Sequence, residues 1–218
     1  LVQGANAMNM FQPEHLDMIL KACKQNGVLC IVDEVMTGFG KTGKLFASEY
    51  MNEKPDIIAL SKALTAGFVP MAITTCTQDI YDAFLDDGVG KAFFHAHTYS
   101  ANPIACSAAL AGIELIQTEA IQENIRTIIA AHKQFDKEIN THAKVARTRQ
   151  LGVIYALDLN IEMDRYGKKR YEIFETLMQQ GVCLRPLGKT IYILPPYVVT
   201  KEQLEKIYDA IKKVLNTI

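Results

Sequence analysis

The sequences IVDEVMTGFGKTG (residues 31–43) and PDIIALSKALTAG (residues 55–67) predict most about the fold of this chain. Each contains an apolar run, one ending at the acidic pair Asp33-Glu34 and the other at Ser61-Lys62. A loop that contains glycine follows each run. In open α/β sheets, ligands bind at the carboxyl ends of the strands. We therefore expect a carboxylate and a lysine to lie at the same edge of a sheet.

The flanking sequence predicts the rest of this sheet. Apolar runs predict strands at residues 28–32, 57–60 and 71–76, and helical spacing predicts helices at residues 13–26 and 80–85. The first run has no alternation, which is typical of a strand buried on both faces. Gly27 is placed to end the helix before it. A mixed or parallel sheet with crossover segments is expected, followed by a long loop over residues 86–103 of the kind that is usually functional or mobile.

The second half of the chain predicts a different order of helices and strands. Helices are expected after Pro103 and over residues 120–142, and from residue 145 short strands alternate with amphipathic helices. Strands are expected at 153–159, 182–185 and 191–194, and helices at 168–180 and 201–216. Thr200 and Gln203 form a plausible capping box, and His132 is expected to be a packed or half-exposed core histidine. We expect part of a large domain over 1–118, a connecting helix over 119–144 and a small α+β domain over 145–218.

Composition excludes several classes of function. The chain has 218 residues, of which 49% are hydrophobic, and a formal net charge of −1. Without a basic excess, binding to nucleic acid or to a membrane surface is not expected, and no apolar run reaches the length of a membrane span. The five cysteines lie far apart, which predicts buried free thiols in a reducing, cytoplasmic setting. The first residues, LVQGANAMNMF, lack an initiator Met and the zones of a signal peptide, so we expect a fragment of a longer protein.

Two other motifs resemble a phosphate-binding loop and a metal site, but each lacks residues that such a site needs. Residues 38–45 nearly match the phosphate-binding pattern G-x-x-x-x-G-K-[ST], but Leu45 stands where a magnesium-binding hydroxyl is needed. His95 and His97 are possible metal ligands, yet no carboxylate or cysteine accompanies them at a recognisable spacing. We expect no metal site.

Asp33 and Lys62 together favour pyridoxal phosphate (PLP) chemistry. A desolvated lysine amine can lose its proton and form a Schiff base with an aldehyde. PLP also needs an anion beside its pyridine nitrogen, so that the ring accepts electrons. The residues alone leave a second hypothesis open, in which the two side chains form a buried ion pair in a domain without catalysis.

The motifs DEVMTGFGKTG and LSKALTAG resemble those of the class III PLP-dependent aminotransferases. The segments FFHAHTYSANPIACSAAL and GVCLRPLGKTIYILPPYV resemble the biotin-pathway branch of this family in particular. The resemblance implies PLP-dependent transferase fold type I, with the C-terminal part of the large α/β domain and the small C-terminal α+β domain. It implies amino transfer, with S-adenosylmethionine as donor, to 8-amino-7-oxononanoate to give 7,8-diaminononanoate, in a homodimer with shared active sites. The alternative is another class III enzyme that acts on ornithine, 4-aminobutyrate or a similar ω-amine.

The resemblance also assigns roles to residues around the cofactor. Lys62 matches the catalytic lysine, which forms the Schiff base with PLP and moves the proton. Asp33 matches the carboxylate at the pyridine nitrogen, and Val35 the side chain packed on one face of the ring. Thr98, with His97 beside it, matches the residue that binds the cofactor phosphate of the neighbouring subunit. Since Thr98 precedes a helix, free N–H groups at the helix start are expected to favour the anion.

Two further residues are matched to the substrate site. Arg185 matches the arginine that binds the substrate carboxylate, where a guanidinium can form two parallel hydrogen bonds. Ala96 stands where the family commonly has a glycine, and its methyl group is expected to crowd the substrate. In the family the catalytic lysine lies past the middle of the chain, so roughly an N-terminal half is expected to be missing. This chain alone is therefore expected to bind PLP poorly.

Overall fold

The computed structural model describes residues 1–218, which form two compact units. The first unit comprises Leu1, Phe11–Phe39 and Lys44–Gln117, and the second comprises Val2–Met10, Gly40–Gly43 and Thr118–Ile218. The expected domain boundaries near residues 118 and 144 remain a prediction about the whole protein.

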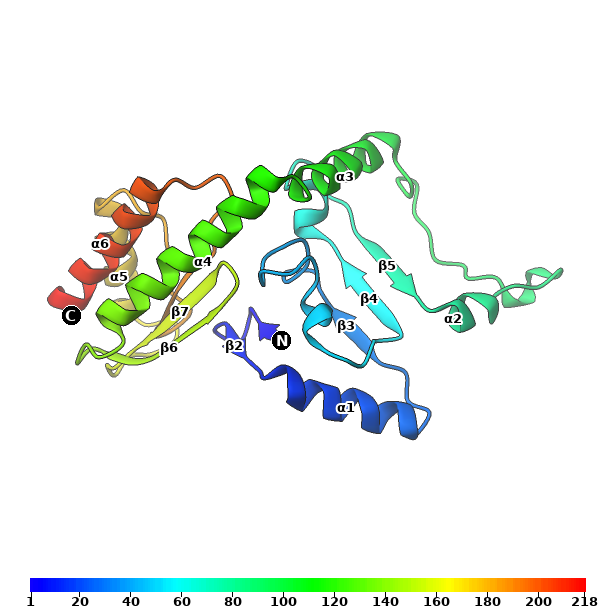
Figure 1. The fold of residues 1–218 in the computed structure, drawn as a ribbon, viewed down its shortest axis with the longest axis horizontal. Coiled ribbons are helices and arrows are strands. Elements are labelled where there is room, and N and C mark those ends of the chain that lie inside the picture. Colours follow the sequence, from blue (N-terminus) through cyan, green and yellow to red (C-terminus); the bar gives the residue numbers. More distant parts are fainter. The chain divides into compact units, whose positions relative to one another are not determined.

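A three-stranded mixed sheet forms the centre of the first unit (Figure 1). Its strands, in spatial order, are β3 (Ile31–Asp33), β4 (Ile57–Leu60) and β5 (Ile73–Cys76). Strands β3 and β4 are parallel, with Asp33 opposite Ala59, while β5 runs antiparallel to β4. The expectation of a mixed or parallel sheet is therefore met by a mixed one.

The expectation that residues 28–32 form a strand buried on both faces is wrong. The ladder begins only at Ile31, whose side chain is 68% exposed, and Val28 and Leu29 are exposed as well. Strand β3 is an edge strand whose other side has no partner strand among residues 1–218. An apolar run can be buried only where neighbouring elements cover it, and residues 1–218 supply no strand on the outer side of β3.

Helices flank the sheet of the first unit. They are α1 (Pro13–Gln25), α2 (Gln78–Asp82) and α3 (Pro103–Ile116), with short 3-10 helices η1 (Ala47–Tyr50), η2 (Lys62–Thr65) and η3 (Val89–Lys91). Gly27 follows α1 with a φ of 67°, as expected for a glycine that ends a helix. Phe39, Leu60, Leu64 and Ala109 form a buried cluster that packs α3 over η2.

The second unit is built around an antiparallel sheet in the order β6 (Val145–Leu151), β7 (Ile154–Leu159) and β8 (Thr190–Ile193). A short hairpin of β1 (Val2–Gln3) and β2 (Asn9–Met10) belongs to the same unit. The central strand β7 is almost wholly buried, as its apolar sequence predicts. Strand β6 was not individually predicted.

The strand expected over residues 182–185 does not form. Pro186 follows it directly and has no N–H group to donate to a ladder. The chain instead makes a tight turn in which Leu187 and Thr190 exchange backbone hydrogen bonds of 2.9 and 3.1 Å. Strand β8 then pairs with β7.

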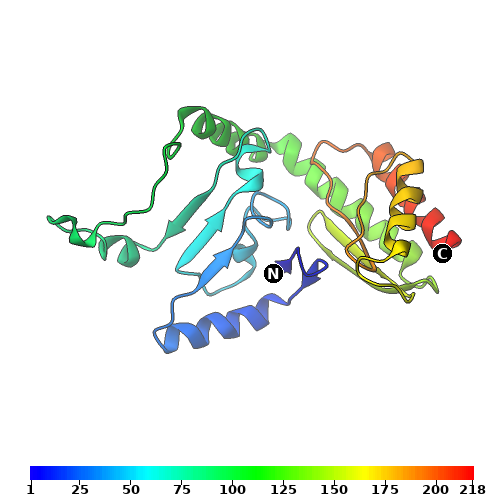
Figure 2. The same ribbon diagram turned by 180° about the vertical axis from the view of Figure 1, so that it is seen from behind.

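Three helices pack on the sheet of the second unit, α4 (Glu119–Ile139), α5 (Lys168–Gln179) and α6 (Lys201–Thr217) (Figure 2). The capping box of α6 is confirmed, because the Gln203 N–H donates to Thr200 Oγ1 at 3.2 Å and the Thr200 N–H donates to Gln203 Oε1 at 2.9 Å. His132 on α4 is fully buried, which confirms it as a core residue.

Burial of the cysteines is only partly as predicted. All five are free, and Cys30 is buried, but Cys76 and Cys183 are exposed. Cys76 ends the outer strand β5, and Cys183 lies in the segment that forms no ladder. No single helix is both long and apolar enough to cross a membrane, although α3 and α4 taken together would pass by length and composition alone.

Candidate active site

Asp33 and Lys62 leave the sheet of the first unit at the same edge. Strands β3 and β4 are parallel neighbours, and Asp33, the last residue of β3, pairs with Ala59. Strand β4 ends at Leu60, the residue after Ala59. Ser61 follows, and Lys62 is the first residue of the 3-10 helix η2. The carboxyl ends of two adjacent strands therefore present the carboxylate and the amine, as predicted.

The Asp33 carboxylate is oriented by its own loop. The N–H of Val35 donates to Asp33 Oδ1 at 2.9 Å, a local turn of the kind that aspartate forms with the residue two positions on. Oδ2 has no hydrogen-bond partner among residues 1–218 and the side chain is exposed. One oxygen thus fixes the rotamer and the other stays available to a donor outside this chain.

Lys62 has a backbone conformation that is rare for lysine. Its φ is 43°, in the left-handed region, which costs about 1–3 kcal/mol for a residue other than glycine. The residues around it are anchored by hydroxyl groups. Ser61 Oγ donates to Met71 O at 2.7 Å, and Thr65 Oγ1 donates to Val69 O at 2.6 Å. Strain held in place by such anchors is common at functional sites.

Helix α3 packs against the η2 turn that begins at Lys62. Gly112 packs so closely that a Cβ on it would lie 3.0 Å from the Leu64 carbonyl oxygen. A larger residue would push α3 away from η2. The position of the Lys62 turn therefore depends on a glycine fifty positions later in the chain.

The hypothesis of a buried ion pair is wrong, because Asp33 and Lys62 are both exposed and form no salt bridge among residues 1–218. Because Lys62 is exposed, residues 1–218 alone do not provide the desolvation that was expected around its amine. The edge is open because nothing in the first unit covers it.

Sequence patterns identified Glu34 only as part of an acidic pair and did not predict its burial. Side chains alternate along a strand, so Glu34 points to the face opposite Asp33 and is completely buried. Its carboxylate accepts hydrogen bonds from Thr37 Oγ1 at 2.9 Å and from the N–H groups of Ala47 and Ser48 at 2.8 and 2.7 Å. Alternation was the signal that could have found it.

Ala96, His97 and Thr98 lie apart from this edge. All three are exposed in the segment between α2 and α3, and Figures 1 and 2 both show that segment standing away from the sheet. The Ser100 hydroxyl accepts from the His97 N–H at 3.1 Å, and His97 Nδ1 accepts from the Tyr99 N–H at 3.1 Å. No hydrogen bond or salt bridge joins this segment to Asp33 or Lys62.

The start of α3 offers no free N–H groups, contrary to expectation. Pro103 has none, and Asn102 Oδ1 accepts from the N–H groups of Ile104 and Ala105 at 3.0 and 3.3 Å. The Cys106 N–H donates to Asn102 O at 2.9 Å. Asn102 therefore satisfies the donors that the sequence argument had assigned to a phosphate.

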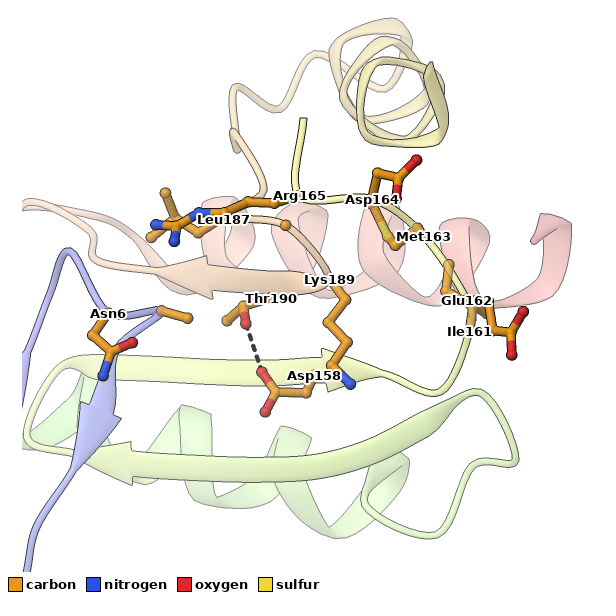
Figure 3. Close-up of a pocket in the computed structure, with 12 residues that line it drawn as sticks. Asn6, Asp158, Ile161, Glu162, Met163, Asp164, Arg165, Leu187, Lys189 and Thr190 are labelled. Atoms are coloured by element: carbon orange, nitrogen blue, oxygen red, sulfur yellow. Dashed lines mark hydrogen bonds between the residues drawn. The ribbon is translucent and has the colours of Figure 1, made fainter. Parts of the chain in front are cut away.

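Arg185 lies in the second unit, in the exposed segment that precedes the Leu187–Thr190 turn. Nearby is an open pocket of about 820 Å³, but Arg185 does not line it (Figure 3). In the pocket Thr190 Oγ1 donates to Asp158 Oδ1 at 2.6 Å, and Asp158 is also paired with Arg149 at 2.9 Å. Its main buried charges already have partners, so the pocket does not by itself indicate a ligand.

The donor set at the β3–β4 edge fits PLP. An exposed primary amine suits its aldehyde, and a carboxylate with one free oxygen suits the N–H of a protonated pyridine ring. Both groups stand on adjacent strands of one unit. Thr98 carries an exposed hydroxyl group on a separate segment of the chain.

Comparison with known proteins decides the family. The model of the family "Aminotransferase class-III" matches residues 1–215. The chain belongs to the class III aminotransferases. Enzymes of this class depend on PLP, and the fold of the chain is that of these PLP-dependent enzymes.

Curated relatives of this class III chain are named adenosylmethionine-8-amino-7-oxononanoate aminotransferase. The one from Synechococcus elongatus is 41% identical over 220 residues, covering 100% of this chain and 51% of the relative. The one from Methanocaldococcus jannaschii is 35% identical over 227 residues, covering 97% and 49%. The chain thus spans about half the length of these relatives and matches their C-terminal half.

Solved structures agree with this assignment. The structure of the Methanocaldococcus jannaschii enzyme is similar with a TM-score of 0.89 at 34% identity, covering 97% of this chain and 52% of that one. An amine transaminase from an uncultivated Pseudomonas species, in its PLP-bound form, is similar with a TM-score of 0.90 at 30% identity, covering 99% and 50%. The fold is shared across class III, so it does not separate one substrate from another.

Proposed function

We propose that this chain is the C-terminal part of an aminotransferase that converts 8-amino-7-oxononanoate to 7,8-diaminononanoate, with S-adenosylmethionine as the amino donor. The observation that carries the proposal is the 41% identity, over the whole chain, to a relative of that name. The segment around Arg185 supports the same branch of the family. The donor set at the ends of β3 and β4 supports the chemistry.

Lys62 carries the catalytic role in this proposal. Bound PLP would supply an aldehyde for an amine and an electron-accepting ring. Lys62 would hold the cofactor through Nζ, which is a nucleophile when unprotonated, and as a free amine Nζ would move a proton as a general base and then a general acid. Lys62 has a strained backbone at φ 43°, and its side chain is exposed. Residues outside this chain would provide the dry surroundings that keep Nζ unprotonated.

Asp33 would keep the pyridine ring of bound PLP protonated. With Oδ1 engaged by the Val35 N–H, Oδ2 is available to accept the N–H of the ring and would keep a negative charge beside it. Val35 would pack against one face of the same ring. Both roles use groups that the structure leaves exposed or half-buried at the sheet edge.

Arg185 would bind the carboxylate at the far end of 8-amino-7-oxononanoate. Its exposed guanidinium can form two parallel hydrogen bonds with a carboxylate. Ala96 would lie against the substrate, where its methyl group narrows the site.

A second copy of the protein completes the site. The segment between α2 and α3 carries several large exposed apolar side chains, including Phe93 at 68%, Phe94 at 84% and Tyr99 at 73% exposure. An exposed apolar patch of this kind marks an interaction surface. Thr98, with His97 beside it, would then reach the cofactor phosphate of the partner subunit in a homodimer. The cytoplasmic location predicted from the free cysteines remains a prediction.

Loading of the whole protein with PLP tests the chemistry. The protein should show the visible absorption band of lysine-bound PLP, borohydride should bleach it, and Lys62→Ala should lack it. Lys54→Ala, which removes an exposed lysine of the same unit, serves as the control and should keep the band. Absence of the band in the parent protein would refute the PLP proposal.

Substrate assays separate this proposal from an enzyme that acts on ornithine or 4-aminobutyrate. We expect turnover of 8-amino-7-oxononanoate in preference to both amines. Arg185→Ala should raise the KM for this keto acid by about tenfold or more, as expected when a charged hydrogen-bonding pair is lost, and should leave the KM for the donor nearly unchanged. An unchanged KM for the keto acid would remove Arg185 from its role.

A further inference from the structure

Glu34 lies between two residues of the proposed cofactor site and takes no direct part in it. Its side chain is 0% exposed, while Asp33 before it is exposed and Val35 after it is half-buried. A fully buried carboxylate is costly unless each oxygen has hydrogen-bond donors. The burial of the Glu34 carboxylate therefore requires a structural explanation.

The partners of Glu34 come from two separate parts of the chain. Ala47 and Ser48 are the first residues of η1, and their N–H groups have no acceptor within that short helix. Oε2 accepts from the Ala47 N–H at 2.8 Å, and Oε1 from the Ser48 N–H at 2.7 Å. Oε2 also accepts from Thr37 Oγ1 at 2.9 Å. The carboxylate therefore ties the turn after β3 to the start of η1.

The backbone of Glu34 is fixed at the same place. Its N–H donates to Ala59 O at 2.9 Å in the neighbouring strand, and its carbonyl accepts from the Gly38 N–H at 3.0 Å. The peptide that follows carries the Val35 N–H, which donates to Asp33 Oδ1 at 2.9 Å. A rotation of the Glu34–Val35 peptide would break this bond and release the Asp33 side chain to other rotamers.

We propose that Glu34 is a positioning residue for Asp33. By anchoring the turn after β3, it holds the Val35 N–H against Oδ1 and so directs Oδ2 toward the pyridine nitrogen of bound PLP. The inference rests on the proposed role of Asp33. Glu34 itself touches neither cofactor nor substrate.

Glu34→Gln is a sharp perturbation because it keeps the size of the side chain. Backbone N–H groups only donate, and an amide has one oxygen and one NH₂ group. In either orientation of the amide, the NH₂ group faces the N–H of Ala47 or of Ser48. One buried donor is left without an acceptor, and the turn must shift to relieve the contact.

The experiment is a double-mutant cycle with Asp33→Asn in the whole PLP-loaded protein. The dissociation constant of PLP and the absorption spectrum of the bound cofactor are measured for both single variants and the double variant. Asp17→Asn is the matched control, because Asp17 also accepts two backbone N–H groups, from Asn52 at 3.1 Å and Glu53 at 2.9 Å, in the same unit. Thermal unfolding of each variant reports its general effect on stability.

We expect Glu34→Gln to raise the dissociation constant of PLP by about tenfold and to shift the spectrum in the direction that Asp33→Asn shifts it. In the Asp33→Asn background the added effect should be less than about twofold. Asp17→Asn should lower thermal stability and leave the spectrum unchanged. If Glu34→Gln does not fold, Thr37→Val, which removes only the hydroxyl bond to Oε2, takes its place in the cycle with a smaller change of the same sign.

Two results would overturn different parts of the argument. Full additivity of the two substitutions, or an unchanged spectrum in the Glu34 and Thr37 variants, would refute the positioning role while Asp33 keeps its own. An Asp33→Asn variant with normal PLP affinity and spectrum would instead refute the proposed cofactor site.

Discussion

Acid destabilisation through His132 is the prediction that the structure supports most directly. His132 lies in the core of the second unit with no exposed surface. Nδ1 is 2.8 Å from Tyr208 Oη and Nε2 is 3.1 Å from Val153 O. Burial lowers the pKa of His132 from its ordinary 6.5 to about 4, although the carbonyl of Val153 opposes the change. The folded protein therefore holds this histidine neutral.

The sign and size of the effect follow from linkage. In the unfolded chain His132 takes up a proton near its ordinary pKa of 6.5, whereas in the fold it does so only near pH 4. Between these values the unfolded state binds more protons, so stability falls as the pH is lowered. At about 1.4 kcal/mol for each pH unit over a window of between two and three units, the free energy of unfolding should fall by roughly 3 kcal/mol. The contribution is fully present above pH 6.5.

Urea unfolding at several pH values measures this loss. Near-ultraviolet circular dichroism is a suitable signal, since Tyr155 and Tyr208 pack around His132 with ring centroids 5.6 and 5.9 Å away. His132→Gln should lower stability at pH 7 and flatten the pH dependence between about pH 6.5 and pH 4. His15→Gln removes an exposed histidine and serves as the control. Equal slopes for the parent protein and His132→Gln would refute the reasoning.

Four further substitutions, one of them a control, test other parts of the structure. Gly152→Ala would place a Cβ 2.1 Å from the backbone carbon of Thr42 at a φ of +59°, so it should lower the free energy of unfolding by about 2–5 kcal/mol. In the control Gly181→Ala, the new Cβ meets only a flexible lysine side chain, and the loss should be about 1–2 kcal/mol. Equal losses for the two variants in urea unfolding would contradict this prediction. Thr98→Val should raise the dissociation constant of PLP by about tenfold in absorbance titrations of the whole protein, and an unchanged value would remove Thr98 from the phosphate site. Thr200→Ala should lower the stability of α6 by about 1 kcal/mol, and hydrogen exchange in its first turn should be unchanged if the cap contributes nothing.

Features with local causes were predictable from the sequence. The bounds of β4 and the cap of α6 follow from an apolar run and from the Thr200 pattern, and both are confirmed. The common edge of Asp33 and Lys62 also follows locally, because Asp33 ends one strand of a parallel pair and Lys62 lies just beyond the end of the other. His132 could be assigned to the core from helical spacing alone.

Features that depend on distant parts of the chain were not predictable. Exposure of Ile31 depends on the absence of a neighbouring strand, which an apolar run cannot reveal. The left-handed φ of Lys62 depends on anchors at Met71 and Val69. Arg185 and Thr98 could be assigned roles only through family resemblance, because their own surroundings in the structure carry little signal.

The Asn102 cap separates the folding of α3 from the arrival of any ligand. Because the helix satisfies its own first N–H groups, it can form in the protein without cofactor, and η2 with Lys62 can rest on it from the outset. The exposed residues ahead of Asn102 can then change position without disturbing the helix against which the Lys62 turn packs.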